Sequence, residues 1–449
     1  MVQPPDLVPG LEEFWTPDES LEGLEKEIAR KPPKFGLGKP HQHPFGVTYR
    51  GPWETMHDGV CIAVRRNACA LRRAKIPVFL QSFSHKHWNR GIVESSFYKD
   101  LPPAVIEEVD HLTELHHERN VAMIHHFVPS KGEFAGQLHP GPIPGGEQAR
   151  VSMIKRTAAY AALEYDKIPE QWIEGFNAFA CVIVPCGTNA GWLRAAGIGV
   201  PVHVVPHPMA LRDPMRSAKA KYTAGTFRFL HVGKWEPRKN QHAVIGAFLH
   251  EFGPNDDVQM VLKCTPYWSG KDYPQNVSES VMYWLKNPKV IEKGWTGSNV
   301  AKHLQVLWKR SLTREELVDL YSSCHSYLQI GRSEGFDLPA FDARVAGLRL
   351  VAMAWGGPAD FIGTDDIRIR YTDFSAPAAA YEAPEGTLWP KPPMDELQAA
   401  MGAAFILRKT PYEVFDASAY TIDVIGQKLR SIVETIALTV GADLAGYEA

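Results

Sequence analysis

The chain has 449 residues, of which 45% are hydrophobic and 22% are charged, so it is neither a disordered nor a fibrous protein. Its 48 Lys and Arg residues and 51 Asp and Glu residues give a net charge of -3, which excludes a global basic field for nucleic acid. No stretch approaches the roughly 18 uninterrupted apolar residues of a membrane span. The length favours two domains.

The chain's beginning predicts no regular domain. Residues 1–45 are rich in Pro, Glu and Lys and lack sustained periodicity, so we expect an irregular N-terminal arm. The first residues contain no basic region followed by an apolar run, so we predict no secretory signal. The six cysteines contain no C-x-x-C pair, which is typical of reduced, buried thiols. A cytoplasmic location is therefore expected.

From Gly46 onward, strand and helix signals alternate, which predicts an α/β architecture with parallel sheets. The apolar spacing in 59–75 predicts a helix with one buried face. Short apolar runs predict strands at 77–80, 121–124, 181–185 and 202–205. Together these elements predict a first Rossmann-like domain over 46–206.

Four arginines lie on the opposite face of that predicted helix: Arg65, Arg66, Arg72 and Arg73. Such a run is usually a solvated helix face. The alternative is a docking patch for an anionic partner, either anionic lipid or a modified nucleic acid that serves as substrate.

A proline-rich, polar stretch predicts an interdomain linker at 207–226. The α/β pattern then restarts, with strands at 227–232, 258–263, 327–330 and 350–353, and helices at 241–252, 315–324 and 394–408. This second domain spans 227–415. The segment 265–303 is too long for a simple turn and is interpreted as an insertion over the cleft, and 376–393 as a loop. A helical segment at 416–449 is predicted to cross back to the first domain.

The first chemically suggestive loop is Gly233-Lys234-Trp235-Glu236-Pro237-Arg238-Lys239. Gly233 allows a sharp turn after the strand, and three cationic side chains follow within six residues. A cationic loop between a strand and a helix suits a phosphate or diphosphate, although an ordinary solvated loop remains open.

The second loop runs from Ser333 to Asp342, with the sequence Ser-Glu-Gly-Phe-Asp-Leu-Pro-Ala-Phe-Asp. Pro339 suits the first turn of a helix and Gly347 its end. This places Glu334 beside the N–H groups of residues 335–338, where an anion would bind. Asp342 lies about one turn inside the helix, where it also complements the helix dipole.

Both loops, in this order, resemble the C-terminal domain of the retaining family-4 glycosyltransferases, which have the GT-B fold of two Rossmann-like domains facing a cleft. That family has a Gly-Arg…Arg-Lys-Gly loop and a Glu-Gly-Phe-Gly-Leu-Pro stretch within a Glu-x7-Glu pattern. The resemblance covers residues 177–365 by motif and 46–130 by pattern. It implies a nucleotide-diphosphate sugar donor of the UDP or GDP type, and it requires no metal or other cofactor.

The resemblance implies a role for each matched residue. Lys234 and Lys239 would neutralise the leaving diphosphate, and Glu334 would contact hydroxyls of the transferred sugar. Asp342 stands where the family has a ribose-binding glutamate. The implied donor-binding set comprises Gly233, Lys234, Lys239, Gly335, Phe336, Asp337, Leu338 and Asp342. Asp337 replaces a usual glycine and adds a negative charge close to the phosphates.

In the first domain the family places a histidine after its fourth strand, in contact with the donor sugar. His125 and His126 both fit that position, and their spacing does not choose between them. Gly59 would let the backbone approach the acceptor or the diphosphate. The other histidine pairs lack a carboxylate or cysteine at ligand spacing, so we predict no metal site.

The sequence therefore predicts a retaining glycosyltransferase with His125 or His126, Glu334 and Lys239 as catalytic residues. Two alternatives remain open. A sugar-nucleotide epimerase uses the same fold, and a non-catalytic sugar-nucleotide binder would need only part of the residue set.

Overall fold

The computed structural model describes residues 46–52, 59–81, 120–129, 152–209, 225–266, 273–308, 312, 314–377, 381, 383–412 and 415–441. The predicted arm over 1–45 and most of the predicted linker over 207–226 lie outside these residues. The described chain forms two compact units. The N-terminal unit contains 46–209, 383–385 and 416–441, and the C-terminal unit contains 225–381 and 386–415.

The N-terminal unit is built on a six-stranded parallel sheet with the order β2-β1-β3-β4-β5-β6. Its strands are β1 (Gly46–Arg50), β2 (Val78–Gln81), β3 (Asn120–Phe127), β4 (Thr157–Ala161), β5 (Cys181–Val184) and β6 (Val202–Val204). Its helices are α2 (Gly59–Arg73), α6 (Glu170–Ala178), α7 (Gly187–Ala195) and α15 (Ile422–Thr439).

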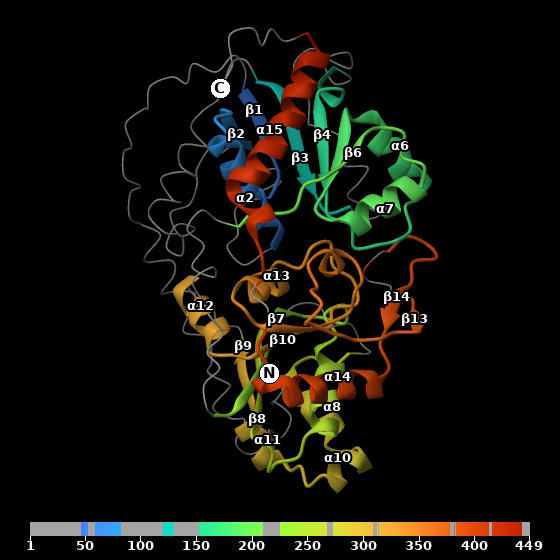
Figure 1. The fold of residues 1–449 in the computed structure, drawn as a ribbon. Coiled ribbons are helices and arrows are strands. Elements are labelled where there is room, and N and C mark those ends of the chain that lie inside the picture. The colour runs from blue at the N-terminus through green and yellow to red at the C-terminus, as the bar shows by residue number, and fades with distance from the viewer. Residues whose placement is uncertain are drawn as a thin grey trace, which may run out of the picture. The chain divides into compact units, whose positions relative to one another are not determined.

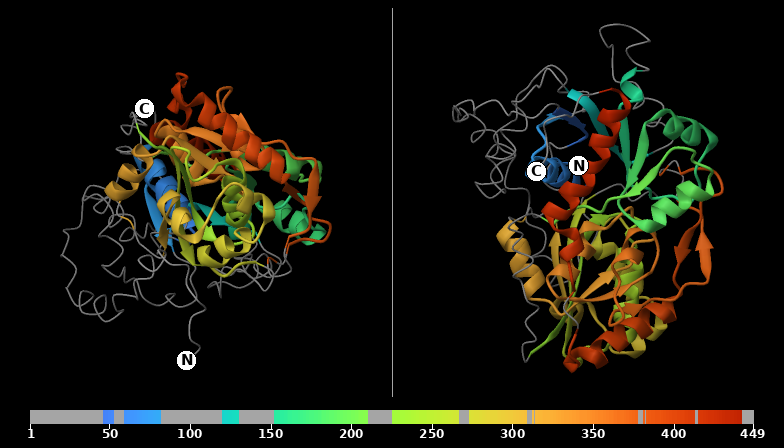
Figure 2. Two further views of the ribbon diagram at one scale, coloured as in Figure 1. Left: turned by 90° about the horizontal axis from the view of Figure 1, so that it is seen from below. Right: turned by 45° about the horizontal axis from the view of Figure 1, so that its top comes forward.

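Helix α15 belongs to this unit although it lies more than 200 residues further along the chain than β6. It lies beside α2 (Figures 1 and 2), and its apolar side chains join those of α2 and the sheet in one core. Ile425, Leu429 and Val433 recur at helical spacing and are fully buried. The apolar face of this helix is therefore buried in the core of the N-terminal unit.

The two helices approach closely at Gly426. A Cβ at this position would lie 2.3 Å from the carbonyl oxygen of Ala70. Gly426→Ala should therefore push α15 away from α2 and lower the melting temperature, with faster proteolytic release of α15. The matched control is Gly191→Ala on α7, where an added Cβ meets no atom within 4 Å. Equal melting temperatures for the Gly426 variant and wild type would contradict this packing.

The C-terminal unit contains a second six-stranded parallel sheet with the order β12-β11-β10-β7-β8-β9. Its strands are β7 (Phe227–Trp235), β8 (Val258–Pro266), β9 (Leu304–Trp308), β10 (Ser326–Gln329), β11 (Arg349–Ala352) and β12 (Ile367–Arg368). Its helices are α8 (Gln241–Glu251), α9 (Val277–Trp284), α10 (Pro288–Glu292), α11 (Gly297–His303), α12 (Arg314–Ser322), α13 (Leu338–Val345) and α14 (Met394–Ile406). The predicted α/β class with two doubly wound parallel sheets is confirmed.

Two predictions for this unit were wrong. The segment 265–303 is not an insertion, because α9, α10 and α11 form the crossover from β8 to β9, and the segment buries Val281, Val290 and Trp295 in the core. The interpretation of 376–393 as loop missed β14 (Trp389–Lys391), which pairs antiparallel with β13 (Asp373–Ser375).

The expected solvated arginine face is also wrong at one position. Arg65 is only 6% exposed. Arg66 donates to the carbonyl of Pro208 at 3.5 Å, and Arg73 pairs with Asp423 at 3.1 Å. Arg72 is half-buried. These four side chains therefore do not form one continuous exposed patch.

The predicted buried cysteines are found. All six lie in the described part of the chain, are buried and form no disulfide. No described helix has both the length and the apolar character needed to span a bilayer.

Candidate functional site

The two predicted loops meet where the order of the C-terminal sheet reverses. Strands β7 and β10 are neighbours, with β8 and β9 on one side and β11 and β12 on the other. Doubly wound sheets bind ligands beyond the carboxyl ends of the strands at such a reversal. The segment containing Lys239 follows β7, and the segment containing Glu334 follows β10. The topology thus brings the two loops to one sheet edge.

Glu334 is the centre of this site and is 4% exposed. The Nζ atom of Lys239 lies 2.6 Å from its Oε1, and the NH1 atom of Arg238 lies 3.1 Å from its Oε2. Burial raises the pKa of Glu334, but the charges of Lys239 and then Arg238 outweigh it and leave the pKa below its ordinary value. Burial lowers the pKa of Lys239, but Glu334 raises it above the ordinary value. Near neutral pH the carboxylate of Glu334 is therefore ionised and lies between two cations.

Arg238 was not among the residues assigned from the sequence. Its NH2 lies 2.8 Å from Oε1 of Glu236, and its NH1 donates to the carbonyl of Ser333 at 2.7 Å. The hydroxyl of Tyr381 donates to Glu236 at 3.2 Å and accepts the backbone N–H of Arg238 at 3.1 Å. The backbone N–H of Arg332 donates to the carbonyl of Arg238 at 2.7 Å. Arg238 therefore fastens the two loops together as well as contacting Glu334.

Gly233 and Lys234 are not in a loop, contrary to the prediction. Strand β7 continues through them and pairs with β8 as far as Trp235, so the chain turns only after that residue. A Cβ at Gly233 would lie 3.3 Å from Nε2 of His231 and 3.6 Å from the side chain of Lys239. The closer neighbour of Gly233 is therefore His231, whereas a Cβ would meet Lys239 only at ordinary contact distance. Lys234 is half-buried at the end of the strand.

His231 lies on β7, close to Lys239 and Glu334, and was not predicted from the sequence. Its Nδ1 lies 2.8 Å from the carbonyl of Leu328, which only accepts, so Nδ1 carries the proton and Nε2 has a lone pair. Burial lowers the pKa of His231 to about 4, so the ring is neutral. The alternation of strand β7 was the available signal that this side chain points inward.

Three glycines hold the loop of Glu334 in place. A Cβ at Gly331 would lie 2.5 Å from Oε1 of Glu334. Gly356 has a φ of +67°, and a Cβ there would approach the carbonyl oxygen of Glu334. The N–H of Gly357 donates to that same carbonyl at 2.8 Å. Only residues without a side chain fit here, and the partners of Gly356 and Gly357 are distant in sequence, so no local pattern identified these two glycines.

Helix α13 begins at this edge, as predicted from Pro339 and Gly347. Its N-cap is Asp337, whose carboxylate accepts the N–H of Ala340 at 3.3 Å. Asp342 lies on the second turn and is 6% exposed. The loop and helix start also contain the other predicted donor-binding residues of this segment: Gly335, Phe336 and Leu338, all buried.

In the N-terminal unit, His125 and His126 lie inside β3 rather than after a strand. The hydroxyl of Tyr49 accepts the amide N–H of Asn67 at 3.1 Å and lies 2.8 Å from Nδ1 of His126. The other ring nitrogen of His126 is Nε2. That Nε2 is buried without a hydrogen-bond partner among the described residues. His126 also stacks on Tyr160, with ring centroids 4.1 Å apart.

Gly59 is the first residue of α2 and is exposed. The expectation that Gly59 lies in a loop was wrong, because α2 begins at this residue. In the described residues, no group of three His, Cys, Asp or Glu side chains is arranged to hold a metal ion.

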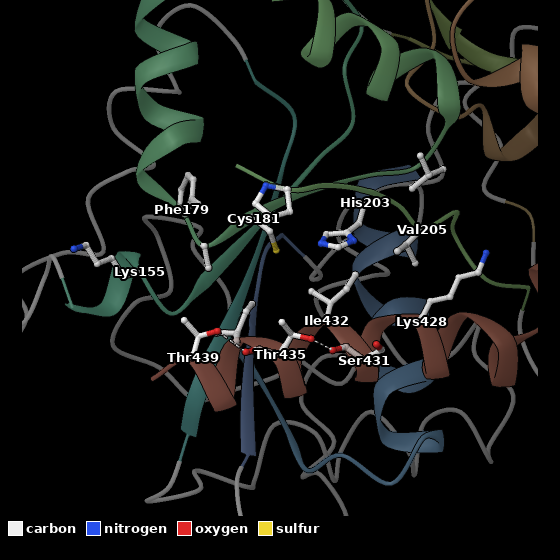
Figure 3. A pocket seen from close by; sticks show the side chains of 14 residues that line it. Lys155, Phe179, Cys181, His203, Val205, Lys428, Ser431, Ile432, Thr435 and Thr439 are labelled. Carbon is white, nitrogen blue, oxygen red and sulfur yellow. Dashed lines mark hydrogen bonds between the residues drawn. The ribbon is translucent and has the colours of Figure 1, made fainter. Parts of the chain in front are cut away.

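A cavity of about 690 Å³ lies elsewhere in the N-terminal unit, between α15 and strands β5 and β6 (Figure 3). Its lining is mainly apolar and contains none of the predicted site residues. The hydroxyls of Thr435 and Thr439 donate to the carbonyls four residues earlier in their own helix. These two hydroxyls are therefore already used within α15.

The buried histidines predict acid instability of the N-terminal unit. Burial, followed by Arg50 and Arg66 respectively, lowers the pKa of His125 and of His207 to about 3. The unfolded chain therefore binds more protons below its ordinary histidine pKa of about 6.5. Stability is fully present above that pH and should fall by up to about 1.4 kcal/mol per pH unit for each histidine as the pH decreases towards 4.

Urea unfolding at pH 7 and pH 5, followed by a probe of the N-terminal unit, measures this loss. The same free energy of unfolding at both pH values would contradict the neutral, buried state of these rings.

No protein-family model matches the chain, and no curated protein matches its sequence. Solved structures do match its fold. The lipopolysaccharide outer core galactosyltransferase WaaB is 11% identical, with a TM-score of 0.53 over 87% of this chain and 99% of that chain. Sucrose-phosphate synthase from Thermosynechococcus elongatus is 16% identical, with a TM-score of 0.50 over 88% and 97%. The N-terminal domain of Candida albicans trehalose-6-phosphate phosphatase is 9% identical, with a TM-score of 0.53 over 90% and 100%. These likenesses show that the chain has the predicted GT-B fold.

Proposed function

We propose that this protein is a glycosyltransferase that moves a sugar from a nucleotide diphosphate, of the UDP or GDP type, to a hydroxyl of an acceptor. The observation that carries the proposal is the position of Lys239, Arg238 and Glu334 at the strand-order reversal of a GT-B fold. An ion pair that only stabilises the fold could lie anywhere in the unit, whereas a diphosphate site is expected at this edge of the sheet.

Each group of the site suits one part of the reaction. Breaking the bond between sugar and diphosphate develops negative charge on the leaving oxygen, and prearranged cations stabilise that charge. Lys239 and Arg238 supply two positive charges, and the start of α13 adds its dipole. Because Glu334 is ionised, it accepts hydrogen bonds from sugar hydroxyls. These groups suffice for charge stabilisation, so the proposal includes no cofactor.

The proposal extends to the stereochemistry. We propose retention: the acceptor oxygen attacks carbon 1 from the face that the diphosphate leaves, and a diphosphate oxygen takes the acceptor proton. Asp342 remains the proposed ribose contact. We propose His125 or His126 as the histidine that meets a substrate oxygen, since the buried Nε2 atoms of the two rings do not distinguish them. Both rings are buried, so this contact requires a movement of their surroundings.

A panel of UDP-, GDP-, ADP- and dTDP-sugars tests the proposal by thermal shift, nucleoside diphosphate release and NMR of the sugar product. We expect one donor to stabilise the protein and to be hydrolysed slowly without acceptor, with the anomeric configuration kept. Conversion to an epimeric sugar nucleotide without acceptor would instead identify an epimerase. Stabilisation without any turnover across a broad acceptor panel would identify a binding protein.

A further inference from the structure

Asp337 occupies the helix start at which a diphosphate would bind. Its backbone is left-handed, with φ 69° and ψ 71°, and its carboxylate accepts the N–H of Ala340. Of the two residues between them, Pro339 has no N–H to offer. The chain's own carboxylate therefore already uses a backbone donor of the first turn of α13, where an anion would otherwise be held.

The groups around Asp337 do not compensate its charge. Lys239 faces it from the loop after β7, but its Nζ is paired with Glu334. Gln329, at the end of β10, hydrogen-bonds to Asp337, and Tyr327 on the same strand faces it. No lysine or arginine of the described chain forms an ion pair with Asp337. Two carboxylates thus share the positive charge of Lys239.

A bound diphosphate would bring two further negative charges to this point. While Asp337 is ionised, it repels the diphosphate and competes for the N–H of Ala340. Once protonated, it becomes a donor that can hydrogen-bond to a phosphate oxygen. We propose that Asp337 makes donor binding proton-linked, so that the nucleotide sugar binds with uptake of one proton by this side chain. This inference rests on the proposed function.

Among the groups described around this helix start, Asp337 is the one that titrates near neutral pH. Burial, followed by Glu334, raises the pKa of Asp337 to about 6. The pKa of Glu334 lies below its ordinary value, that of Lys239 above it, and that of Tyr327 well above it. That of His231 is lowered to about 4. Donor affinity should therefore be highest near pH 5 and fall tenfold per pH unit above 6, or about 100-fold by pH 8.

The experiment is isothermal titration of the full chain with the nucleotide sugar chosen by the donor panel, from pH 5 to pH 8.5. A nucleotide sugar is used because its diphosphate is a diester that does not titrate in this range. Two buffers of different ionisation enthalpy give the number of protons taken up. Wild type should take up close to one proton at pH 7.5.

Asp337→Asn is the matched variant, since asparagine has the same shape, tolerates the left-handed region and caps helices. It should bind the donor with an affinity that does not change between pH 6 and pH 8, and without proton uptake. The inference would be overturned, and the proposed function left standing, if donor affinity in wild type did not depend on pH. A pH dependence that persists in Asp337→Asn would have the same consequence. Failure of every donor to bind either protein at any pH would overturn both.

Discussion

Lys239→Met and Glu334→Gln should have opposite effects on nucleotide binding. Without Lys239, Glu334 keeps only Arg238 as a partner, and a diphosphate loses one of its two cations. We expect nucleoside diphosphate affinity to fall by at least about 10-fold and kcat by about 100- to 1,000-fold, the usual loss for one charge-stabilising group. In Glu334→Gln, Lys239 loses its internal counter-charge and Arg238 keeps only Glu236, so nucleoside diphosphate affinity should rise several-fold while kcat still falls.

Both variants should also lose stability, by about 3 kcal/mol, because each removes one charged partner from a buried ion-pair cluster. Stability alone therefore does not distinguish a functional site from a structural ion pair, whereas the opposite affinities do. Lys167→Met is the matched control, since Lys167 pairs with Asp166 at 3.5 Å and is half exposed. It should change neither affinity nor stability by a measurable amount. Unchanged nucleotide affinity in both site variants would show that the pair is structural.

Gly357→Ala should disrupt the loop of Glu334 without touching any charged group. An added Cβ would lie 2.2 Å from Cα of Phe336 and 2.7 Å from its backbone N and C atoms, and backbone atoms cannot give way as a flexible side chain does. We expect a loss of about 3 kcal/mol or more and the loss of donor binding. Urea unfolding and donor titration measure the two effects.

Gly191→Ala again serves as the control. It lies inside helix α7 with nothing within 4 Å of its Cβ position, so it should stabilise by about 0.5–1 kcal/mol. Wild-type stability in Gly357→Ala would show that the loop does not need this close contact.

The sequence predicted most strands and helices because their apolar spacing is local. Helix α15 illustrates this, since its buried positions follow a 3.6-residue period. The strand that carries Gly233 extended further than predicted because pairing with β8, a tertiary effect, overrides the local preference of glycine. The crossover from β8 to β9 was mistaken for an insertion because its three helices are short and give only weak periodic signals.

The location of the candidate site could be predicted from the sequence, but the ion pairs within it could not. Motif spacing placed Glu334 and Lys239 after neighbouring strands, and the structure brings them within 2.6 Å. Spacing did not show that Arg238, rather than Lys234, supplies the second contact to Glu334. That choice depends on where β7 ends: Lys234 is still in the strand, whereas Arg238 follows the turn after Trp235. The support from Gly357 was equally hidden, because it depends on a contact across about 20 residues.

The most direct test of the central claim is a crystal structure of the protein with its selected donor or the corresponding nucleoside diphosphate. We predict phosphate density beside the start of α13, with Nζ of Lys239 moved from Glu334 to within hydrogen-bonding distance of a phosphate oxygen. A nucleotide bound away from the carboxyl ends of β7 and β10, with the 2.6 Å contact between Lys239 and Glu334 intact, would contradict the account.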